Sequence, residues 1–436
     1  MRFGTDGVRG RANTELTPAL ALNLGRAAGR VLGADLAVVG GDSRISTPML
    51  EAAFVAGLAS EGVEVHRLGV TPTPAVAFEA QRLGAMGAVI SASHNPYHDN
   101  GIKLFALGGS KLPGDVEARV EAELASLGDP IGDPAPIHGR GASAEDYIEH
   151  LLAVLDGRDL SGLGVVADAA NGAASHLVAD VLQRTGARTV VVNAQPNGTN
   201  INAGCGATDP SGLQALVTAE RAQVGIALDG DADRLIAVDE LGQIVDGDHI
   251  IAICAADLRS RGLLHDDTVV VTVMTNLGFR LAMEASGIDV VETPVGDRHV
   301  LEALAAGGYS LGGEQSGHVI FADRATTGDG LLTGLVLLDI VQRSGRPLSE
   351  LAASAMTQLP QVLVNVPVDA RRDDAAALLA DDIATWEQQL GHTGRILVRP
   401  SGTEPLVRIM VEAPTDELAD EVAQALRARL VAATAG

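Results

Sequence analysis

Residues 36–68, with the sequence LAVVGGDSRISTPMLEAAFVAGLASEGVEVHRL, contain one complete strand–loop–helix–strand unit. The small apolar residues at 36–40 predict a buried strand, the polar residues at 42–44 predict a loop, and residues 47–60 predict a helix. A second strand is predicted at 63–68. Because the two strands begin about 27 residues apart, they indicate a βαβ unit rather than a hairpin.

The same unit occurs twice more along the chain. One copy has predicted strands at 164–167 and 189–192, and the other has them at 268–273 and 289–292, each pair with a helix between its strands. The repetition predicts three similar α/β domains with mixed sheets. Each domain is expected to present its strand-end loops as a binding edge, as open α/β sheets do.

The remaining segments predict a leading helix, a connection and a smaller tail domain. Thr17 is a suitable cap for a helix over 17–32, with Pro18 at its first position. Residues 126–143, rich in Gly, Pro and Asp, predict an exposed connection that leads into a helix at 144–156. The tail is predicted as an α+β domain with strands at 362–366, 396–399 and 406–411 and a helix at 416–432. The predicted domains are residues 1–150, 151–248, 249–360 and 361–436.

Composition excludes several classes of protein. The 436 residues are 46% hydrophobic but only 2% aromatic, so the core is expected to consist of Ala, Val, Leu and Ile. A formal charge of −25 argues against nucleic-acid binding, so a phosphorylated substrate would need a local basic pocket. Cys205 and Cys254 are too few for a disulfide framework or a thiolate metal site. With no apolar leader and no membrane-length apolar run, we expect a cytoplasmic protein.

A polar loop at 91–103 follows the apolar run at 87–90. It places the hydroxyl of Ser93 near an imidazole at His94 and a cation at Lys103. A loop at the end of a buried strand is a common place for chemistry, so Ser93 is a candidate nucleophile. An N-capping serine in an ordinary loop is the alternative.

Three carboxylates alternate in the loop at 228–234: Asp229, Asp231 and Asp233. Carboxylates at this spacing can converge on a hard cation such as Mg²⁺. A calcium-binding EF-hand is disfavoured, because Arg234 stands where that loop needs glycine and strands flank the site, although Glu240 falls at the twelfth position. A solvated acidic turn without metal stays open.

Two further loops suit the recognition of a phosphorylated sugar. At 312–318, Glu314 and Ser316 can bind sugar hydroxyls, and His318 can transfer a proton or bind phosphate. At 399–405, backbone N–H groups, hydroxyls and the Arg399 guanidinium suit a phosphate dianion, with Arg408 close behind. An ordinary proline-flanked turn is the alternative for the second loop.

Taken together, these motifs resemble those of the α-D-phosphohexomutase family over essentially the whole chain. The matching motifs are TDGVRG at 5–10, SASHNP at 91–96, DGDADR at 229–234, GEQSGH at 313–318 and RPSGTEP at 399–405. The resemblance implies three α/β domains and a C-terminal α+β domain arranged around a central cleft. It also implies a phosphoserine at Ser93 and Mg²⁺ bound by that phosphate with Asp229, Asp231 and Asp233.

The resemblance also implies roles for individual residues. Those implied in catalysis are Arg9, Ser93, His94, Lys103 and His318. Those implied in substrate binding are Arg298, Glu314, Ser316, Arg399, Ser401, Gly402, Thr403 and Arg408. In terms of domains, it puts the phosphoserine loop in residues 1–150, the metal loop in 151–248, the sugar-recognition loop in 249–360 and the phosphate-binding loop in 361–436.

The activity implied by the resemblance is an isomerase reaction on a phosphorylated amino sugar. Gln315 resembles the glucosamine branch, which implies conversion of glucosamine 6-phosphate to glucosamine 1-phosphate through a 1,6-bisphosphate, as a step towards UDP-N-acetylglucosamine and peptidoglycan precursors. Glucosamine or glucose 1,6-bisphosphate would be the activating phosphoryl donor, and a homodimer is the expected assembly. Action on glucose or mannose phosphates, or a phosphosugar-binding regulator without turnover, are the alternatives.

Overall fold

The computed structural model describes residues 4, 7–131, 133–139, 144–369, 372–401 and 405–434. They divide into two compact units. The first unit comprises residues up to 274 together with 288–355, and the second comprises 275–287 together with 356–436. Among the described residues, no helix combines the length and apolar character that crossing a membrane requires.

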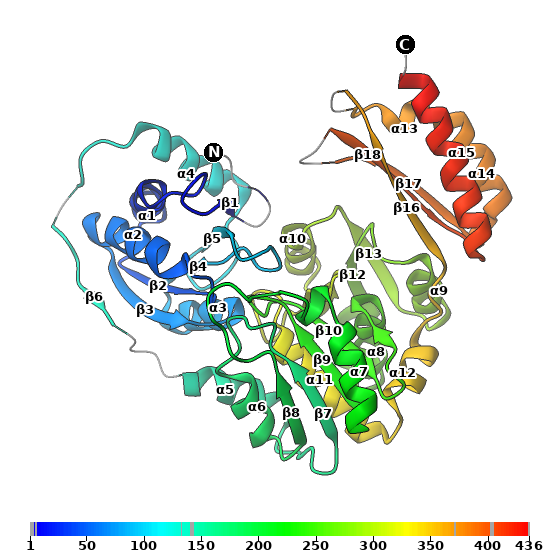
Figure 1. Cartoon of the computed structure of the whole chain (residues 1–436), viewed down its shortest axis with the longest axis horizontal. Helices are drawn as coiled ribbons and strands as arrows, with labels where there is room; N and C mark the ends of the chain where they lie inside the picture. The colour runs from blue at the N-terminus through cyan, green and yellow to red at the C-terminus, as the bar shows by residue number, and fades with distance from the viewer. Residues whose placement is uncertain are drawn as a thin grey trace. The chain divides into compact units, whose positions relative to one another are not determined.

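The first unit begins with a six-stranded mixed sheet (Figure 1). Its order is β1-β5-β4-β2-β3-β6, with β4, β2, β3 and β6 parallel and with β5 antiparallel to both β4 and β1. The strands are β1 (Val8–Arg11), β2 (Leu36–Gly41), β3 (Glu64–Val70), β4 (Met86–Ile90), β5 (Asp99–Phe105) and β6 (Ile137–His138).

Helices cover both faces of this sheet, because its central strands are apolar on both sides. Ala37 and Val39 of β2 pack into the core beneath one group of helices, whereas Val38 packs with the helix on the opposite face. The first face carries α1 (Pro18–Leu32), α2 (Thr47–Ser60) and α4 (Gly114–Ser126), and the second carries α3 (Thr73–Leu83). Thr17 caps α1 by accepting the Leu20 N–H, as predicted.

A five-stranded mixed sheet of order β11-β10-β9-β7-β8 follows. β9, β7 and β8 are parallel, and β10 runs antiparallel to β9, so the chain turns back at the carboxyl end of β9. The elements are α5 (Ala144–Leu152), β7 (Gly164–Asp168), α6 (Val178–Arg184), β8 (Arg188–Val192), α7 (Ser211–Glu220), β9 (Val224–Leu228), β10 (Leu235–Asp239) and β11 (Ile244–Val245).

The third sheet of this unit has four strands in the order β13-β12-β14-β15, with only β15 antiparallel. The elements are α8 (Gly247–Ser260), β12 (Thr268–Thr272), β13 (Asp289–Thr293), α10 (Asp297–Gly307), β14 (Leu311–Gly313), β15 (Val319–Phe321), α11 (Gly330–Ser344) and α12 (Leu348–Ala355). Short 3₁₀ turns lie at Ala153–Leu155, Gly206–Thr208 and His265–Asp267.

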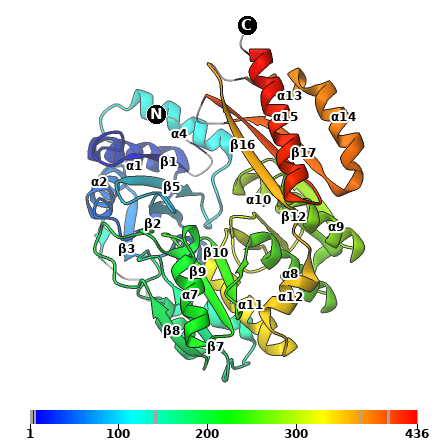
Figure 2. The same cartoon turned by 45° about the vertical axis from the view of Figure 1, so that its right-hand side comes forward.

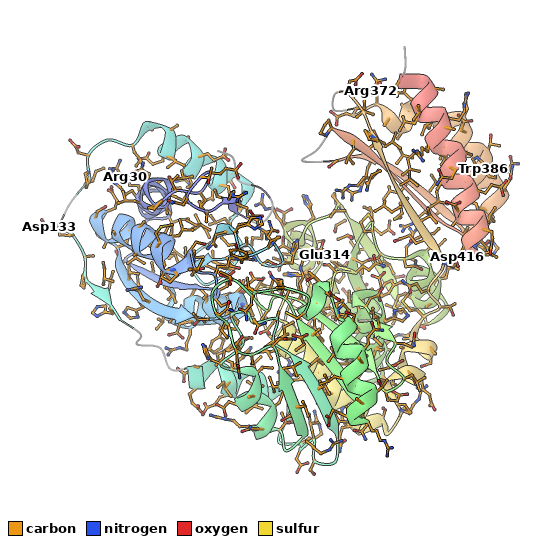
Figure 3. All side chains as sticks on the ribbon, in the orientation of Figure 1. Arg30, Asp133, Glu314, Arg372, Trp386 and Asp416 are labelled. Atoms are coloured by element: carbon orange, nitrogen blue, oxygen red, sulfur yellow. The ribbon has the colours of Figure 1, made fainter. Side chains whose placement is uncertain are left out.

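The second unit is built on a three-stranded antiparallel sheet of order β16-β18-β17. Helices α14 and α15 cover the same face of it (Figure 2), and the single tryptophan, Trp386 on α14, packs against their shared core (Figure 3). Glu412 is fully buried and accepts the Leu277 N–H and the Arg395 guanidinium, which joins α9 to the sheet. The elements are α9 (Leu277–Ala285), β16 (Gln361–Pro367), α13 (Ala375–Leu378), α14 (Ala380–Leu390), a 3₁₀ turn (Gly391–Thr393), β17 (Arg395–Pro400), β18 (Leu406–Glu412) and α15 (Asp416–Thr434).

The predicted fold class of three α/β domains with mixed sheets and a C-terminal α+β domain is confirmed. Several elements were not predicted. They include strand β5, which begins inside the predicted loop at 91–103, the short edge strand β6 inside the connection, and helices α3, α4, α8, α10, α11 and α14. The predicted helix at 144–156 is α5 followed by the 3₁₀ turn Ala153–Leu155. The four-way division of the chain at residues 150, 248 and 360 stays a prediction.

Candidate active site

Two strand-end loops of the first unit meet at a cluster of buried polar side chains. Ser93 follows β4, and the aspartates Asp229, Asp231 and Asp233 follow β9. The Ser93 hydroxyl donates a 2.5 Å hydrogen bond to Asp229 Oδ2, although the residues are 136 positions apart. All four residues are buried, with exposed fractions of 6% or less. The structure therefore brings the predicted nucleophile and the predicted metal ligands together.

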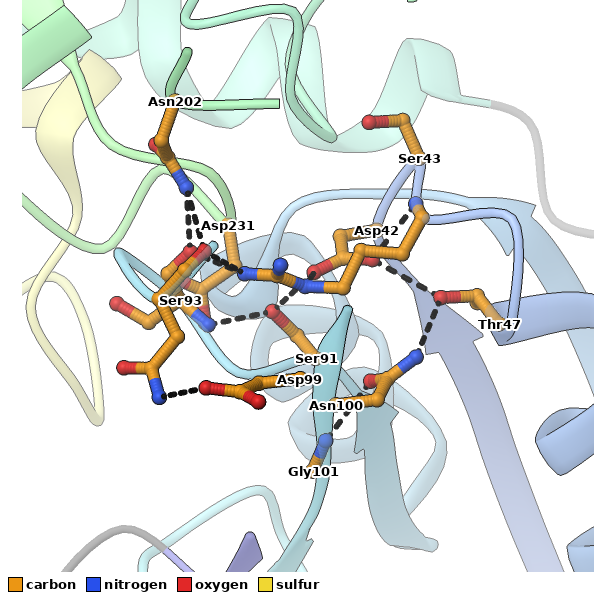
Figure 4. A network of polar contacts seen from close by, with 12 residues as sticks. Asp42, Ser43, Thr47, Ser91, Ser93, Asp99, Asn100, Gly101, Asn202 and Asp231 are labelled. Atoms are coloured by element: carbon orange, nitrogen blue, oxygen red, sulfur yellow. Dashed lines mark hydrogen bonds and ion pairs between the residues drawn. The ribbon is translucent and has the colours of Figure 1, made fainter. Parts of the chain in front are cut away.

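The Ser93 backbone is held in an unusual conformation. Its φ of +50° lies in the left-handed region, which costs a non-glycine residue about 1–3 kcal/mol unless its surroundings enforce it. Here the Ser91 hydroxyl accepts the Ser93 N–H at 2.9 Å, and the Asn202 side chain donates to the Ser93 carbonyl at 2.9 Å (Figure 4). These bonds fix the direction in which the Ser93 hydroxyl points.

Arg44 is the centre of the network that supports this loop. Its fully buried guanidinium forms an ion pair with Asp42 and donates 2.8 Å hydrogen bonds to the carbonyl oxygens of Ser93, Asn95 and Pro96. Asp42 in turn accepts the hydroxyl of Ser91 (Figure 4). Burial raises the pKa of Asp42, while Arg44 opposes that rise. Sequence reasoning identified residues 42–44 only as a loop, although a charged pair directly after a buried strand is a signal of such a role.

The three aspartates form one of the two groups of potential metal ligands in the described part of the chain, with ligand atoms within 4.8 Å of one another. Lys103 Nζ lies 2.7 Å from Asp231 Oδ2 and 2.9 Å from Asp233 Oδ2. Thr73, which was not predicted, donates to Asp231 Oδ2 at 2.6 Å. Asp231 Oδ1 is buried and has no hydrogen-bond partner among the described residues. A buried acceptor in that state fits a cation ligand.

The pKa values of two of the aspartates are shifted in opposite directions. Burial, with the neighbouring charges of Asp233 and Asp231, raises the pKa of Asp229 well above its usual value. Burial alone would also raise the pKa of Asp233, but Lys103, His318 and Arg234 outweigh it and lower that pKa. The repulsion felt by Asp229 is the kind that a dication relieves.

The EF-hand alternative is wrong. The loop connects β9 to the antiparallel strand β10, not two helices. Glu240, at the twelfth position, accepts hydrogen bonds from Ser349. It is therefore engaged outside the aspartate cluster.

His94 lies beside the Ser93 hydroxyl, and Arg9 lies close to His94. His94 Nδ1 is 3.3 Å from Ser93 Oγ. Burial, with the charges of Arg234 and Arg9, lowers the pKa of His94 to about 4, so this imidazole is neutral near pH 7. Arg9 is on β1, opposite Gly101 of β5, and its effect on His94 shows that the predicted cation is close.

The turn between β14 and β15 brings His318 to the aspartates. Its Nδ1 lies 3.7 Å from Asp233 Oδ1, and its Nε2 accepts the Gly328 N–H at 3.2 Å. Burial would lower the pKa of His318, but Asp233 outweighs it and raises that pKa. On the same turn, Glu314 accepts the Gly296 N–H at 3.2 Å, and Ser316 is exposed.

Arg298 has protein partners in this structure. At the start of α10, its guanidinium forms an ion pair with Glu117 of α4, and the adjacent Asp297 pairs with Lys111. Both pairs join α10 to the first sheet and its helices. A substrate-binding role for Arg298 stays a prediction.

The second unit contains the predicted phosphate loop. Arg399 and Arg408 stand directly opposite each other on β17 and β18. Burial and the charge of Arg408 lower the pKa of Arg399. Like charges directly across a sheet are destabilising, and a bound anion removes that penalty. Ser401 is buried next to them, whereas Gly402 and Thr403 lie outside the described residues.

Four family models match successive parts of the chain. They are described as phosphoglucomutase/phosphomannomutase alpha/beta/alpha domains I, II and III and the C-terminal domain. They match residues 1–129, 145–242, 246–359 and 363–429 respectively.

Curated relatives and solved structures agree with these matches. The phosphoglucosamine mutase of Frankia alni is 54% identical, with 99% of this chain and 98% of that protein covered. The phosphoglucosamine mutase of Streptomyces avermitilis is 53% identical, with coverages of 97% and 96%. A phosphoglucomutase/phosphomannomutase family structure from Burkholderia thailandensis superposes with a TM-score of 0.85 at 27% identity, covering 99% of this chain and 98% of that one. N-acetylphosphoglucosamine mutase of Aspergillus fumigatus, solved with GlcNAc-6P and magnesium, shares the fold with a TM-score of 0.71 at 20% identity, covering 100% and 96%.

Proposed function

Because the chain belongs to the α-D-phosphohexomutase family and acts as a phosphoglucosamine mutase, we propose that Ser93 carries the phosphoryl group that it transfers. The reaction interconverts glucosamine 6-phosphate and glucosamine 1-phosphate by intramolecular phosphotransfer. One observation carries the proposal for Ser93: its hydroxyl is fixed by a left-handed backbone and lies 2.5 Å from a buried aspartate of the triad.

The proposed cycle has two phosphoryl transfers. The oxygen of the sugar 1-hydroxyl attacks phosphoserine 93, the bond from phosphorus to Ser93 Oγ breaks, and glucosamine 1,6-bisphosphate forms. The bisphosphate then turns end over end, Ser93 Oγ attacks the 6-phosphoryl group, and the bond from phosphorus to the sugar 6-oxygen breaks, with a proton returned to that oxygen. Glucosamine 1-phosphate leaves, and the phosphoserine is regenerated. Such transfers depend mainly on positioning and on neutralising charge.

Mg²⁺ is the proposed cofactor, held by Asp229, Asp231, Asp233 and the Ser93 phosphate. The buried Asp231 Oδ1 and the raised pKa of Asp229 support this choice. When bound, the ion would neutralise charge on the transferring phosphoryl group. A 1,6-bisphosphate of glucosamine or glucose is the proposed donor that first phosphorylates Ser93.

The side chains around Ser93 have complementary proposed roles. Arg9 and Lys103 supply positive charge beside the phosphoryl group. His94 is neutral and lies 3.3 Å from Ser93 Oγ, so it can accept a hydroxyl proton. His318, beside Asp233, is the second candidate for proton transfer.

The substrate's other end needs separate recognition. We assign the phosphate that is not being transferred to Arg399, Ser401 and Arg408, with Gly402 and Thr403 completing the loop. The cross-strand pair of arginines supports this assignment. Glu314 and Ser316, with Arg298, are assigned to the sugar.

The test is a coupled assay for conversion of glucosamine 6-phosphate with and without Mg²⁺. Ser93→Ala should abolish turnover and the phosphoprotein signal, whereas Ser126→Ala, at the exposed end of α4, should leave both unchanged. Wild-type activity in the Ser93 variant would refute its role. Comparing kcat/KM for glucosamine, glucose and mannose phosphates measures the specificity within the family.

A further inference from the structure

Three potential metal ligands gather at the outer edge of the first sheet, on strands that contribute no residue to the aspartate cluster. Glu64 and His66 lie on β3, and His138 lies on β6, the edge strand next to it (Figure 1). Within the described ranges, this is the second of two groups in which at least three potential metal-ligand atoms lie within 4.8 Å of one another.

Strand pairing brings the three side chains together. β3 and β6 are parallel, with His66 directly opposite His138. Glu64 is two residues before His66, so it projects from the same face of the sheet. Nε2 of His66 and Nε2 of His138 both lie 3.1 Å from the same oxygen, Glu64 Oε1. The two imidazole rings meet edge to face, with their centroids 5.1 Å apart.

This spacing fits a small dication. Zinc bonds to imidazole nitrogen and to carboxylate oxygen are about 2.0–2.1 Å long, so two ligands of a tetrahedral site lie about 3.3 Å apart. The two nitrogen-to-oxygen distances of 3.1 Å are close to that value. The side chains are 30–51% exposed, so solvent can supply a further ligand.

We propose that Glu64, His66 and His138 bind a first-row transition-metal dication of the Zn²⁺ class. Two imidazoles and one carboxylate are the ligands that such ions prefer, whereas the all-oxygen aspartate cluster suits Mg²⁺. The site is therefore chemically distinct from the active site. Without a metal, each imidazole would instead donate a hydrogen bond to Glu64.

Metal binding would stabilise the packing of the connection after α4 against the sheet. β6 has only two residues, and the neighbouring backbone bonds are Val65 N–H to Pro136 O and Ala135 N–H to Ala59 O. Metal bonds from Glu64 and His66 on β3 to His138 would add to these contacts. Bound metal should therefore protect residues 133–139 from proteolysis.

The test is a titration of the metal-free full-length protein with Co²⁺, in excess Mg²⁺ that occupies the aspartate cluster. Wild-type protein should develop the visible absorption bands typical of Co²⁺ with a low coordination number. Zn²⁺ should abolish these bands by displacing the Co²⁺. His138→Asn and Glu64→Gln should each weaken Co²⁺ binding at least about tenfold. Mutase activity measured with Mg²⁺ should be unchanged in both variants.

The matched control is His299→Asn. His299 is an exposed histidine 3.7 Å from Glu302 and belongs to neither ligand group within the described residues. This variant should bind Co²⁺ as the wild type does. Absence of the bands in the wild type would overturn the proposal. A Co²⁺ affinity equal to that of the wild type in the His138 and Glu64 variants would overturn it as well. Loss of the bands in Asp231→Asn alone would assign them to the aspartate cluster and also overturn it.

Discussion

Arg44 gives the most direct test of how the fold positions the nucleophile. Its guanidinium is buried, pairs with Asp42 and donates to three carbonyl oxygens of the Ser93 loop. We expect Arg44→Lys to keep a positive charge near Asp42 but to lose the planar set of donors that holds the loop. The variant should therefore allow the Ser93 backbone to leave its left-handed conformation.

The size of the effect follows from these contacts. Removing one partner of a buried ion pair costs about 3–5 kcal/mol, which is the expected loss of unfolding free energy for Arg44→Ala. Lysine restores part of the pair but leaves carbonyl oxygens without donors, and each charged hydrogen bond is worth about 1.5–3 kcal/mol. We therefore expect Arg44→Lys to lose about 2–4 kcal/mol. A displacement of the Ser93 hydroxyl by about 1 Å should lower kcat about a hundredfold.

Urea unfolding and steady-state kinetics measure the two effects separately. Arg67→Lys is the matched control, because Arg67 pairs with Glu51 through two hydrogen bonds in the same domain but is 39% exposed. That pair should contribute at most about 1 kcal/mol, with no effect on kcat. If Arg44→Lys kept wild-type kcat while losing stability, Arg44 would serve only the core, and the reasoning about Ser93 would be refuted.

Three further predictions concern other parts of the chain. Arg399→Ala should raise KM far more than it lowers Tm, since Arg399 is only half-buried; a collapse in Tm would contradict the assignment. Burial raises the pKa of Asp329 to about 6 from 3.8, so the folded state binds the proton more tightly and the wild type should lose stability as pH rises from about 4 to about 6. Asp329→Asn keeps an acceptor for the Leu332 N–H and should abolish that loss in urea unfolding measured across this range; an unchanged slope would show that another group titrates. Asp231→Asn should raise the Mg²⁺ concentration needed for half-maximal activity at least about tenfold, and an unchanged requirement would remove Asp231 from the metal site.

Local sequence patterns were enough to predict the three repeated strand–helix–strand units and the strands of the tail, but not the helices α3, α4, α8, α10 and α11. The run at 36–40 and the helix after it correspond to β2 and α2, because both faces of a parallel strand are buried and the strand is therefore uniformly apolar. β6 was missed because two residues carry no periodicity. α14 was missed because its sequence ADDIATWEQQL has few apolar residues.

The residues of the candidate site also fall into those that the sequence predicted and those that it did not. The aspartates and Ser93 were recognisable because each stands in a compact motif at a strand end. Arg44 and Asn202 were not, because their contacts with Ser93 span 49 and 109 positions. A local pattern such as the Asp42–Arg44 pair after β2 does not show which distant loop it contacts. Thr73, which contacts Asp231 across 158 positions, was missed for the same reason.

The bond from Leu277 to Glu412 has a consequence for biosynthesis, since it joins residues 135 positions apart. During translation, α9 is synthesised long before β18. The segment 275–287 can therefore pack against its own unit only after the last strand has been made. A shortened chain that stops before Glu412 would leave this segment without its anchor. In such a shortened chain, the apolar residues of α9 would be exposed and accessible to quality-control proteases.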